Sequence, residues 1–157
     1  MEHINKISFE YNFISDKGII SNKDKRDIPT ILAVEATLTI KINNELYFET
    51  EIAILEFYKA LYEWKQQIKE NHIPEFHYYT IEYGDYEDGA ILSIIPFSNK
   101  ARVRSIWEEQ NLYNVFALDY IVNEFTNLEE KLRQAIEEHY NINLKKFINH
   151  IPYMTNG

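Results

Sequence analysis

Hydrophobic and polar positions repeat the same order of patterns in the two halves of this chain. In each half, strand-like alternation is followed by a long helical repeat, first over roughly residues 5–69 and again over roughly residues 76–140. Alternation places every second side chain on one face of a strand, whereas spacings of three and four gather side chains on one face of a helix. The pattern therefore predicts three strands and a helix, repeated once.

The first half begins with clean alternation from Lys6 to Phe13, which predicts a half-buried strand. A polar stretch over residues 15–28 has no sustained period and predicts an exposed loop. A second strand is expected over about Thr30–Ile42 and a third over about 46–52. The following helix is expected over about 53–70, with Trp64 at the centre of its apolar stripe.

The turn between the second and third strands follows from the parity of their apolar positions. A two-residue loop would place Ile40 opposite Tyr47 and mix the two faces. A three-residue loop through Glu45 instead pairs Ile42 with Leu46, Ile40 with Phe48 and Leu38 with Thr50. We therefore predict the three-residue loop.

The second half adds further strands and a longer helix. The expected elements are strands at 76–83, 90–97 and about 102–108, a loop or short strand at 111–117, a helix from Leu118 to about 140 capped by Asn141, and an extra turn at 144–148. The strand at 90–97 is apolar on both parities, which predicts a central strand covered on both faces. The fold class predicted is α+β: one mostly antiparallel sheet of about six strands in β-β-β-α-β-β-β-α order, with both helices on one face.

Composition limits the organisation and the partners of the chain. Its 157 residues and 45% hydrophobic content predict a single domain over residues 1–157, with a frayed tail at 152–157. The net charge of −9 disfavours nucleic acid and anionic membranes and favours a basic protein partner. With no cysteine, no leader and no long apolar run, a soluble cytoplasmic protein is expected, and the oligomeric state stays open.

The chain contains few motifs that could carry chemistry. His72 and His77 flank Glu75 in a pattern with metal-ligand types, but Pro74 prevents the pair from sharing one helix face. The turn over residues 84–89 lacks the ligand spacing of a calcium loop, and no nucleophile elbow or phosphate loop is present. We therefore predict no catalytic residue, no metal and no cofactor.

The remaining signal is a surface that combines carboxylates with tyrosines. Parity places Glu10, Glu35, Glu49, Glu51 and Glu82 on the outer sheet face. Tyr47 and Tyr78 share that parity, whereas Tyr86 lies within an acidic turn. Tyrosine beside charge is typical of protein interfaces. The residues predicted to bind a partner are Asp85, Tyr86, Glu87, Asp88, Tyr47, Glu49, Tyr78 and Glu82.

In size, charge and expected architecture the chain resembles the small acidic α+β immunity or inhibitor proteins of bacterial toxin systems. That resemblance implies a protein that acts by masking another protein. The favoured interpretation is a non-enzymatic protein-binding module of the immunity or inhibitor type, with an acidic, tyrosine-containing surface for a basic partner. Two alternatives stay open: a subunit of a phage-defence or anti-defence assembly, and a small-molecule-binding domain with a pocket between sheet and helices.

Overall fold

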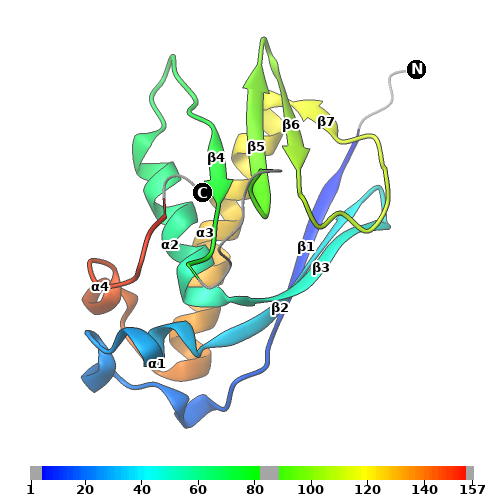
Figure 1. Cartoon of the computed structure of the whole chain (residues 1–157). Helices are drawn as coiled ribbons and strands as arrows, with labels where there is room; N and C mark the ends of the chain where they lie inside the picture. The colour runs from blue at the N-terminus through cyan, green and yellow to red at the C-terminus, as the bar shows by residue number, and fades with distance from the viewer. Residues whose placement is uncertain (1–4, 82–88, 155–157) are drawn as a thin grey trace.

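The computed structural model describes residues 5–81 and 89–154, and these form two antiparallel sheets with four α-helices (Figure 1). The first sheet has the order β1-β2-β3 and the second the order β4-β5-β6-β7. The strands are β1 (Ile7–Phe13), β2 (Glu35–Ile42), β3 (Glu45–Ala53), β4 (Phe76–Tyr78), β5 (Leu92–Phe97), β6 (Lys100–Arg104) and β7 (Val115–Ala117). The helices are α1 (Ile28–Leu32), α2 (Ile54–Gln67), α3 (Leu118–Tyr140) and α4 (Leu144–Phe147), with 3-10 turns at Lys17–Ile19 and Asn22–Asp24.

The α+β class with antiparallel strands and two long helices is confirmed, but the prediction of one six-stranded sheet is wrong. Each half builds its own meander, in which strands pair with their neighbours in the sequence. Helix α2 leads the chain away from β3, and β4 then pairs with β5 rather than with the first sheet. Periodicity reports which face of a strand is buried, and it carries no information on whether two hairpins join.

The strand expected from Thr30 begins later, because its first residues form the short helix α1 instead. Asp27 is the N-cap, and its carboxylate accepts a hydrogen bond from the Thr30 amide at 3.3 Å. Pro29 lies in the first turn, where its missing N–H costs nothing. Helix α1 places Ile31 in the core. The stretch before it is mostly exposed, as expected, although Ile20 anchors it in the core.

The hairpin between β2 and β3 combines a two-residue turn with a bulge, so the predicted three-residue loop is wrong. Asn43 and Asn44 have φ of 52° and 68°, and Ile42 pairs with Glu45. The register then shifts, so that Lys41 pairs with Leu46 and Ile40 with Phe48. Tyr47 is the extra residue. The bulge restores the parity beyond it, and the predicted pairs Ile40 with Phe48 and Leu38 with Thr50 are confirmed.

The two long helices follow their predicted stripes. Trp64 in α2 is 3% exposed, as predicted, and α2 ends at Gln67, a few residues earlier than expected. Helix α3 ends at Tyr140, and its C-cap Asn141 has the expected left-handed conformation with φ of 55°. Within the described residues, no helix is both long and apolar enough to cross a membrane.

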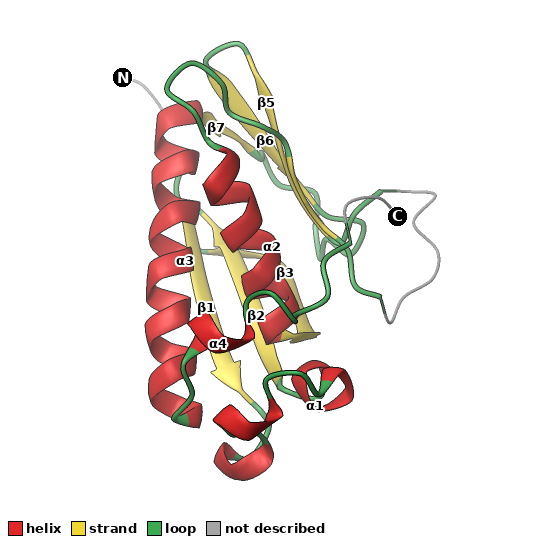
Figure 2. Ribbon diagram, turned by 90° about the vertical axis from the view of Figure 1, so that its left-hand side faces the viewer, coloured by secondary structure: helices red, strands yellow, loops and turns green. Residues whose placement is uncertain are grey.

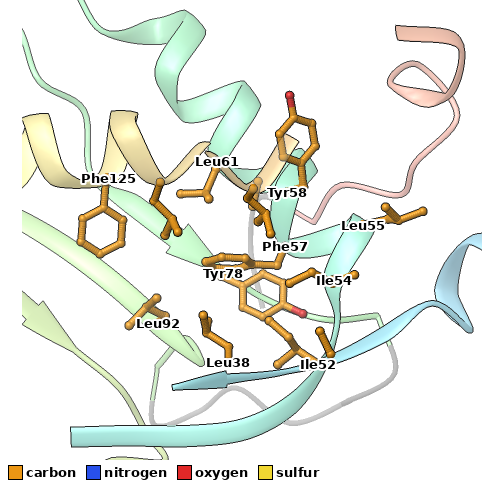
Figure 3. Packing of buried hydrophobic residues seen from close by; sticks show 14 of the residues in the cluster. Leu38, Ile52, Ile54, Leu55, Phe57, Tyr58, Leu61, Tyr78, Leu92 and Phe125 are labelled. Atoms are coloured by element: carbon orange, nitrogen blue, oxygen red, sulfur yellow. The ribbon is translucent and has the colours of Figure 1, made fainter. Parts of the chain in front are cut away.

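The core lies where α2 and α3 pack against each other and against both sheets (Figure 2). The Phe125 ring of α3 is central, because its centroid is 5.0 Å from Phe9 of β1 and 6.1 Å from Phe76 of β4. Figure 3 shows Tyr78 of the second sheet packed among Phe57, Leu38 and Ile52. The helices thus hold the two sheets together through one continuous apolar cluster.

Candidate functional site

The acidic turn predicted as the partner-binding loop falls outside the described residues. These positions are Asp85, Tyr86, Glu87 and Asp88, and Glu82, which was predicted on the outer sheet face, also lies outside the described residues. Their role in binding stays a prediction. The candidate site is therefore built from the side chains of the described residues.

Tyr47 was predicted on the outer sheet face, and the structure corrects this: its side chain is fully buried. As the extra residue of the bulge, it turns toward the second sheet, where its hydroxyl donates to the carbonyl oxygen of Val103 at 3.3 Å. Burial, together with the nearby charge of Glu108, raises the pKa of Tyr47 to about 12. Tyr47 links the two sheets and offers no surface to a partner.

Tyr78 is likewise buried, so its predicted outward orientation is wrong. Its ring centroid is 5.2 Å from that of Phe57 in α2, and its hydroxyl donates to a Glu56 carboxylate oxygen at 3.2 Å. Phe76 shares the same inward face. The outward parity was inferred from Glu82 on a strand predicted over residues 76–83, but β4 ends at Tyr78, so alternation does not carry the face of residue 82 back to Tyr78.

The outer face of the first sheet carries the carboxylates that alternation predicted. Glu10, Glu35, Glu49 and Glu51 are all exposed. Cross-strand pairing places Glu10, Thr39 and Glu49 in one row, and Thr39 donates to the Glu49 carboxylate at 2.8 Å. Lys41 offsets part of the charge through a 3.9 Å ion pair with Glu10. This surface, called here the acidic face, is Glu10, Glu35, Glu49 and Glu51.

A groove follows the free edge of β1, directly beside the acidic face. It has a volume of about 600 Å³ and lies between β1, from Ile7 to Asn12, and the flank of α3. The α3 wall consists of Glu124, Asn127, Leu128 and Lys131. The sequence did not indicate this groove, because edge position depends on strand order and strand order is not encoded in alternation.

A buried polar cluster joins α2 to α3. Glu129 is 5% exposed, accepts a hydrogen bond from the Tyr58 hydroxyl at 2.6 Å and forms a 2.8 Å ion pair with Lys65. Burial and the hydrogen bond to Glu129 raise the pKa of Tyr58. A burial penalty on the Lys65 ammonium is outweighed by Glu129 and Glu130, so the pKa of Lys65 is also raised. The bonded residues lie 64 to 71 positions apart in the sequence, so no local motif indicates this cluster.

The cluster borders a cavity of about 440 Å³, which is also lined by Leu144 of α4 and by Ile148, the C-cap of α4. This volume lies within the range of small-molecule sites. However, the buried carboxylate is already matched by Tyr58 and Lys65, which accounts for the cluster as a structural link between the helices. The cavity is therefore a weaker candidate for the functional site than the acidic face.

A serine, a histidine and a glutamate also meet on the second sheet. His77 Nδ1 lies 2.8 Å from Ser93 Oγ, and His77 Nε2 lies 2.8 Å from Glu75 Oε1. A nucleophilic serine must reach a substrate, but Ser93 is 3% exposed and is simply the cross-strand neighbour of His77. Across residues 5–81 and 89–154, no group of three or more His, Asp or Glu side chains is placed to hold a metal ion.

Comparison with known proteins places the chain in a family. A search of curated proteins and a search of solved structures each found no match. The model of one family matches residues 9–138, which run from β1 to the last turn of α3 and include both sheets and both long helices. The chain therefore belongs to the family described as a domain of unknown function, DUF7878.

Proposed function

We propose that this protein is a non-enzymatic module that binds a basic protein partner through the acidic face, in the manner of an inhibitor or immunity protein that masks its target. The observation that carries the proposal is the exposure of Glu10, Glu35, Glu49 and Glu51 on one side of the first sheet. The acidic turn around Tyr86, at residues 84–89, is retained as a second predicted contact of the same partner.

Electrostatics explains why such a face suits a cationic partner. Glu10 and Glu49 are two strand spacings apart, about 10 Å, where two like charges in water repel by about 0.4 kcal/mol. A Lys or Arg side chain placed between them is attracted to both carboxylates, and this attraction outweighs their mutual repulsion. The chain as a whole adds a net charge of −9, which attracts a basic protein before contact.

Charge on the rim of an interface acts mainly on the rate of encounter. We therefore expect a variant with Glu10→Gln, Glu49→Gln and Glu51→Gln to associate more slowly with its partner, and with a weaker salt dependence. The matched control carries Glu70→Gln, Asp119→Asn and Glu138→Gln, which remove the same charge from exposed positions outside the acidic face, one in the turn after α2 and two in α3.

The experiment begins with capture of partners from the native host at low salt, and each captured protein is identified and purified. Association and dissociation rates of the wild type and both variants are then measured at low and moderate salt. A lower association rate in the acidic-face variant, with the control variant close to the wild type, supports the proposal. Equal rates in both variants contradict it. Neutralising Asp85, Glu87 and Asp88 together, and truncating Tyr86 separately, tests the loop against the same partner.

A further inference from the structure

We propose that the free edge of β1 receives an extended segment of the basic partner as a fourth strand of the first sheet. This inference rests on the proposed function and adds how the partner is held. The acidic face supplies long-range attraction, whereas the edge supplies backbone hydrogen bonds at a defined position.

The edge of β1 has backbone groups that point away from the sheet. The amide of Ile7 donates to the Tyr120 hydroxyl at 2.9 Å, so the backbone groups of Ile7 point away from β2. The backbone groups of Lys6 point the other way, because its carbonyl accepts from the Asn43 amide at 2.8 Å. In an antiparallel strand these directions alternate, so Phe9 and Tyr11 direct their N–H and C=O groups to the same free edge as Ile7.

Ile7 and its neighbours on this edge differ in whether their outward backbone groups have a hydrogen-bond partner. The Tyr120 hydroxyl serves both the N–H and the C=O of Ile7, at 2.9 and 3.4 Å. Among the described residues, no comparable side chain or strand bonds to the outward groups of Phe9 or Tyr11. The edge is thus capped at its beginning and left open along its middle, which is the part that the groove follows.

The groove has the shape that an added strand requires. It follows β1 from Ile7 to Asn12, a length that about six extended residues occupy at about 3.3 Å each. One wall is the flank of α3, where Leu128 lies between polar residues. Inward-facing side chains of an added strand would contact Leu128 and the half-buried rings of Phe9 and Tyr11.

The two faces of the added strand define the chemistry of the occupant. Its inward positions require apolar side chains, whereas its outward positions continue the outer sheet surface beside Ser8, Glu10 and Asn12. Lysine or arginine at the outward positions would lie next to Glu10. The occupant is therefore an extended segment of a basic protein in which cationic and apolar residues alternate.

A second copy of this chain fits the same edge less well. An antiparallel pairing of two β1 strands centred on Glu10 places that carboxylate opposite its own equivalent, and directly opposed like charges destabilise a sheet. Each chain also carries a net charge of −9, so the two copies repel each other.

The probe is a capped peptide of about eight residues in which Lys alternates with Val, long enough to span β1. A second peptide has the same composition with its Lys and Val in separate blocks, which keeps the charge and removes the strand pattern. A third keeps the alternating sequence with N-methyl groups on every second amide, which removes donors on the peptide side. Binding is followed by fluorescence anisotropy and by amide hydrogen exchange.

The matched variants are Tyr11→Pro and Tyr11→Ala. Both remove the ring, but proline also removes the outward N–H, and a proline at this edge position leaves the hydrogen bonds to β2 in place. We expect Tyr11→Pro to bind the alternating peptide at least about 10-fold more weakly than Tyr11→Ala. We also expect slower exchange of the Phe9 and Tyr11 amides in the wild-type complex, and weaker binding of the N-methylated peptide. Urea midpoints of both variants report whether the fold is intact, and the N-methylated peptide tests the same bonds without altering the protein.

Several results would overturn strand addition. One is equal affinity of the two Tyr11 variants, a second is failure of the alternating peptide to bind, and a third is equal binding of the alternating and block peptides. Self-association of the wild type that Tyr11→Pro abolishes would replace the partner segment with a second copy. If neutralising the acidic face weakens binding of the captured partner while Tyr11→Pro leaves that binding unchanged, the proposed function stands. The β1 edge is then not the place where the partner binds.

Discussion

The centre of the α2 stripe offers the sharpest test of how the core is built. Trp64 is 3% exposed, its ring centroid is 5.9 Å from Phe76 and 6.4 Å from Phe125, and its indole N–H donates to the Pro74 carbonyl at 3.0 Å. It therefore joins α2 to β4, to α3 and to the segment that follows α2. Trp64→Ala removes all of these contacts at once.

The expected loss follows from the buried area of the side chain. A tryptophan buries roughly 150–250 Å², which at about 25 cal/mol per Å² corresponds to about 4–6 kcal/mol. The alanine retains part of this, and the half-buried Pro74 carbonyl can accept a water, so the expected destabilisation is roughly 3–5 kcal/mol. With a urea slope of about 2 kcal/mol per M, the unfolding midpoint should fall by about 2 M.

The assay is urea unfolding followed by far-UV circular dichroism, because the substitution removes one of the two tryptophans that would report by fluorescence. Tyr113→Ala is the control, since Tyr113 is 67% exposed and its loss should change the free energy of unfolding by less than about 0.5 kcal/mol. A loss of unfolding free energy below about 1 kcal/mol for Trp64→Ala would refute this prediction, because the apolar stripe of α2 would then contribute little to the stability of the core.

Two further predictions concern the buried polar groups. Because Tyr47 has a pKa of about 12 against an ordinary value of 10.0, its contribution to stability is present below about pH 10 and is lost as the pH rises toward 12, at up to about 1.4 kcal/mol per pH unit. Urea midpoints measured over this window should fall less steeply for Tyr47→Phe than for the wild type, and identical slopes would contradict the assignment. Glu129→Ala leaves the Tyr58 hydroxyl and the Lys65 ammonium without their carboxylate and should cost roughly 2–4 kcal/mol, below the full range for buried pairs because Lys65 still reaches water. Glu130→Ala removes an exposed partner of Lys65 and should cost less than about 1 kcal/mol in urea unfolding of the two variants, so similar losses for Glu129→Ala and Glu130→Ala would show that burial is not what matters.

Part of the candidate site could be predicted from the alternation of β1, β2 and β3. That pattern placed Glu10, Glu35, Glu49 and Glu51 on the outer face, and all four are exposed there. It failed at Tyr47 because a single bulge shifts the parity of one residue, and a bulge arises from how a turn and a register are reconciled between two strands. The groove beside β1 had no signal in the sequence.

The sequence by itself determined what depends on neighbours along the chain. The stripe of α2, the extent of α3, the left-handed cap at Asn141 and most of the strands follow from spacings of two, three and four residues and from local capping chemistry. Where local signals competed, capping by Asp27 with Pro29 in the first turn formed a helix at residues for which alternation predicted a strand.

Only the tertiary structure decided which elements meet. The division into two sheets, the free edge of β1, the inward turn of Tyr47 and the bond between Tyr58 and Glu129 all depend on pairings between residues far apart in the sequence. Such pairings are selected by the packing of the whole core around Phe125, where each face must be covered and each buried polar group must find a partner. A periodic pattern indicates that one face of a helix or strand is buried, whereas the surface that covers this face depends on how all the other elements pack together.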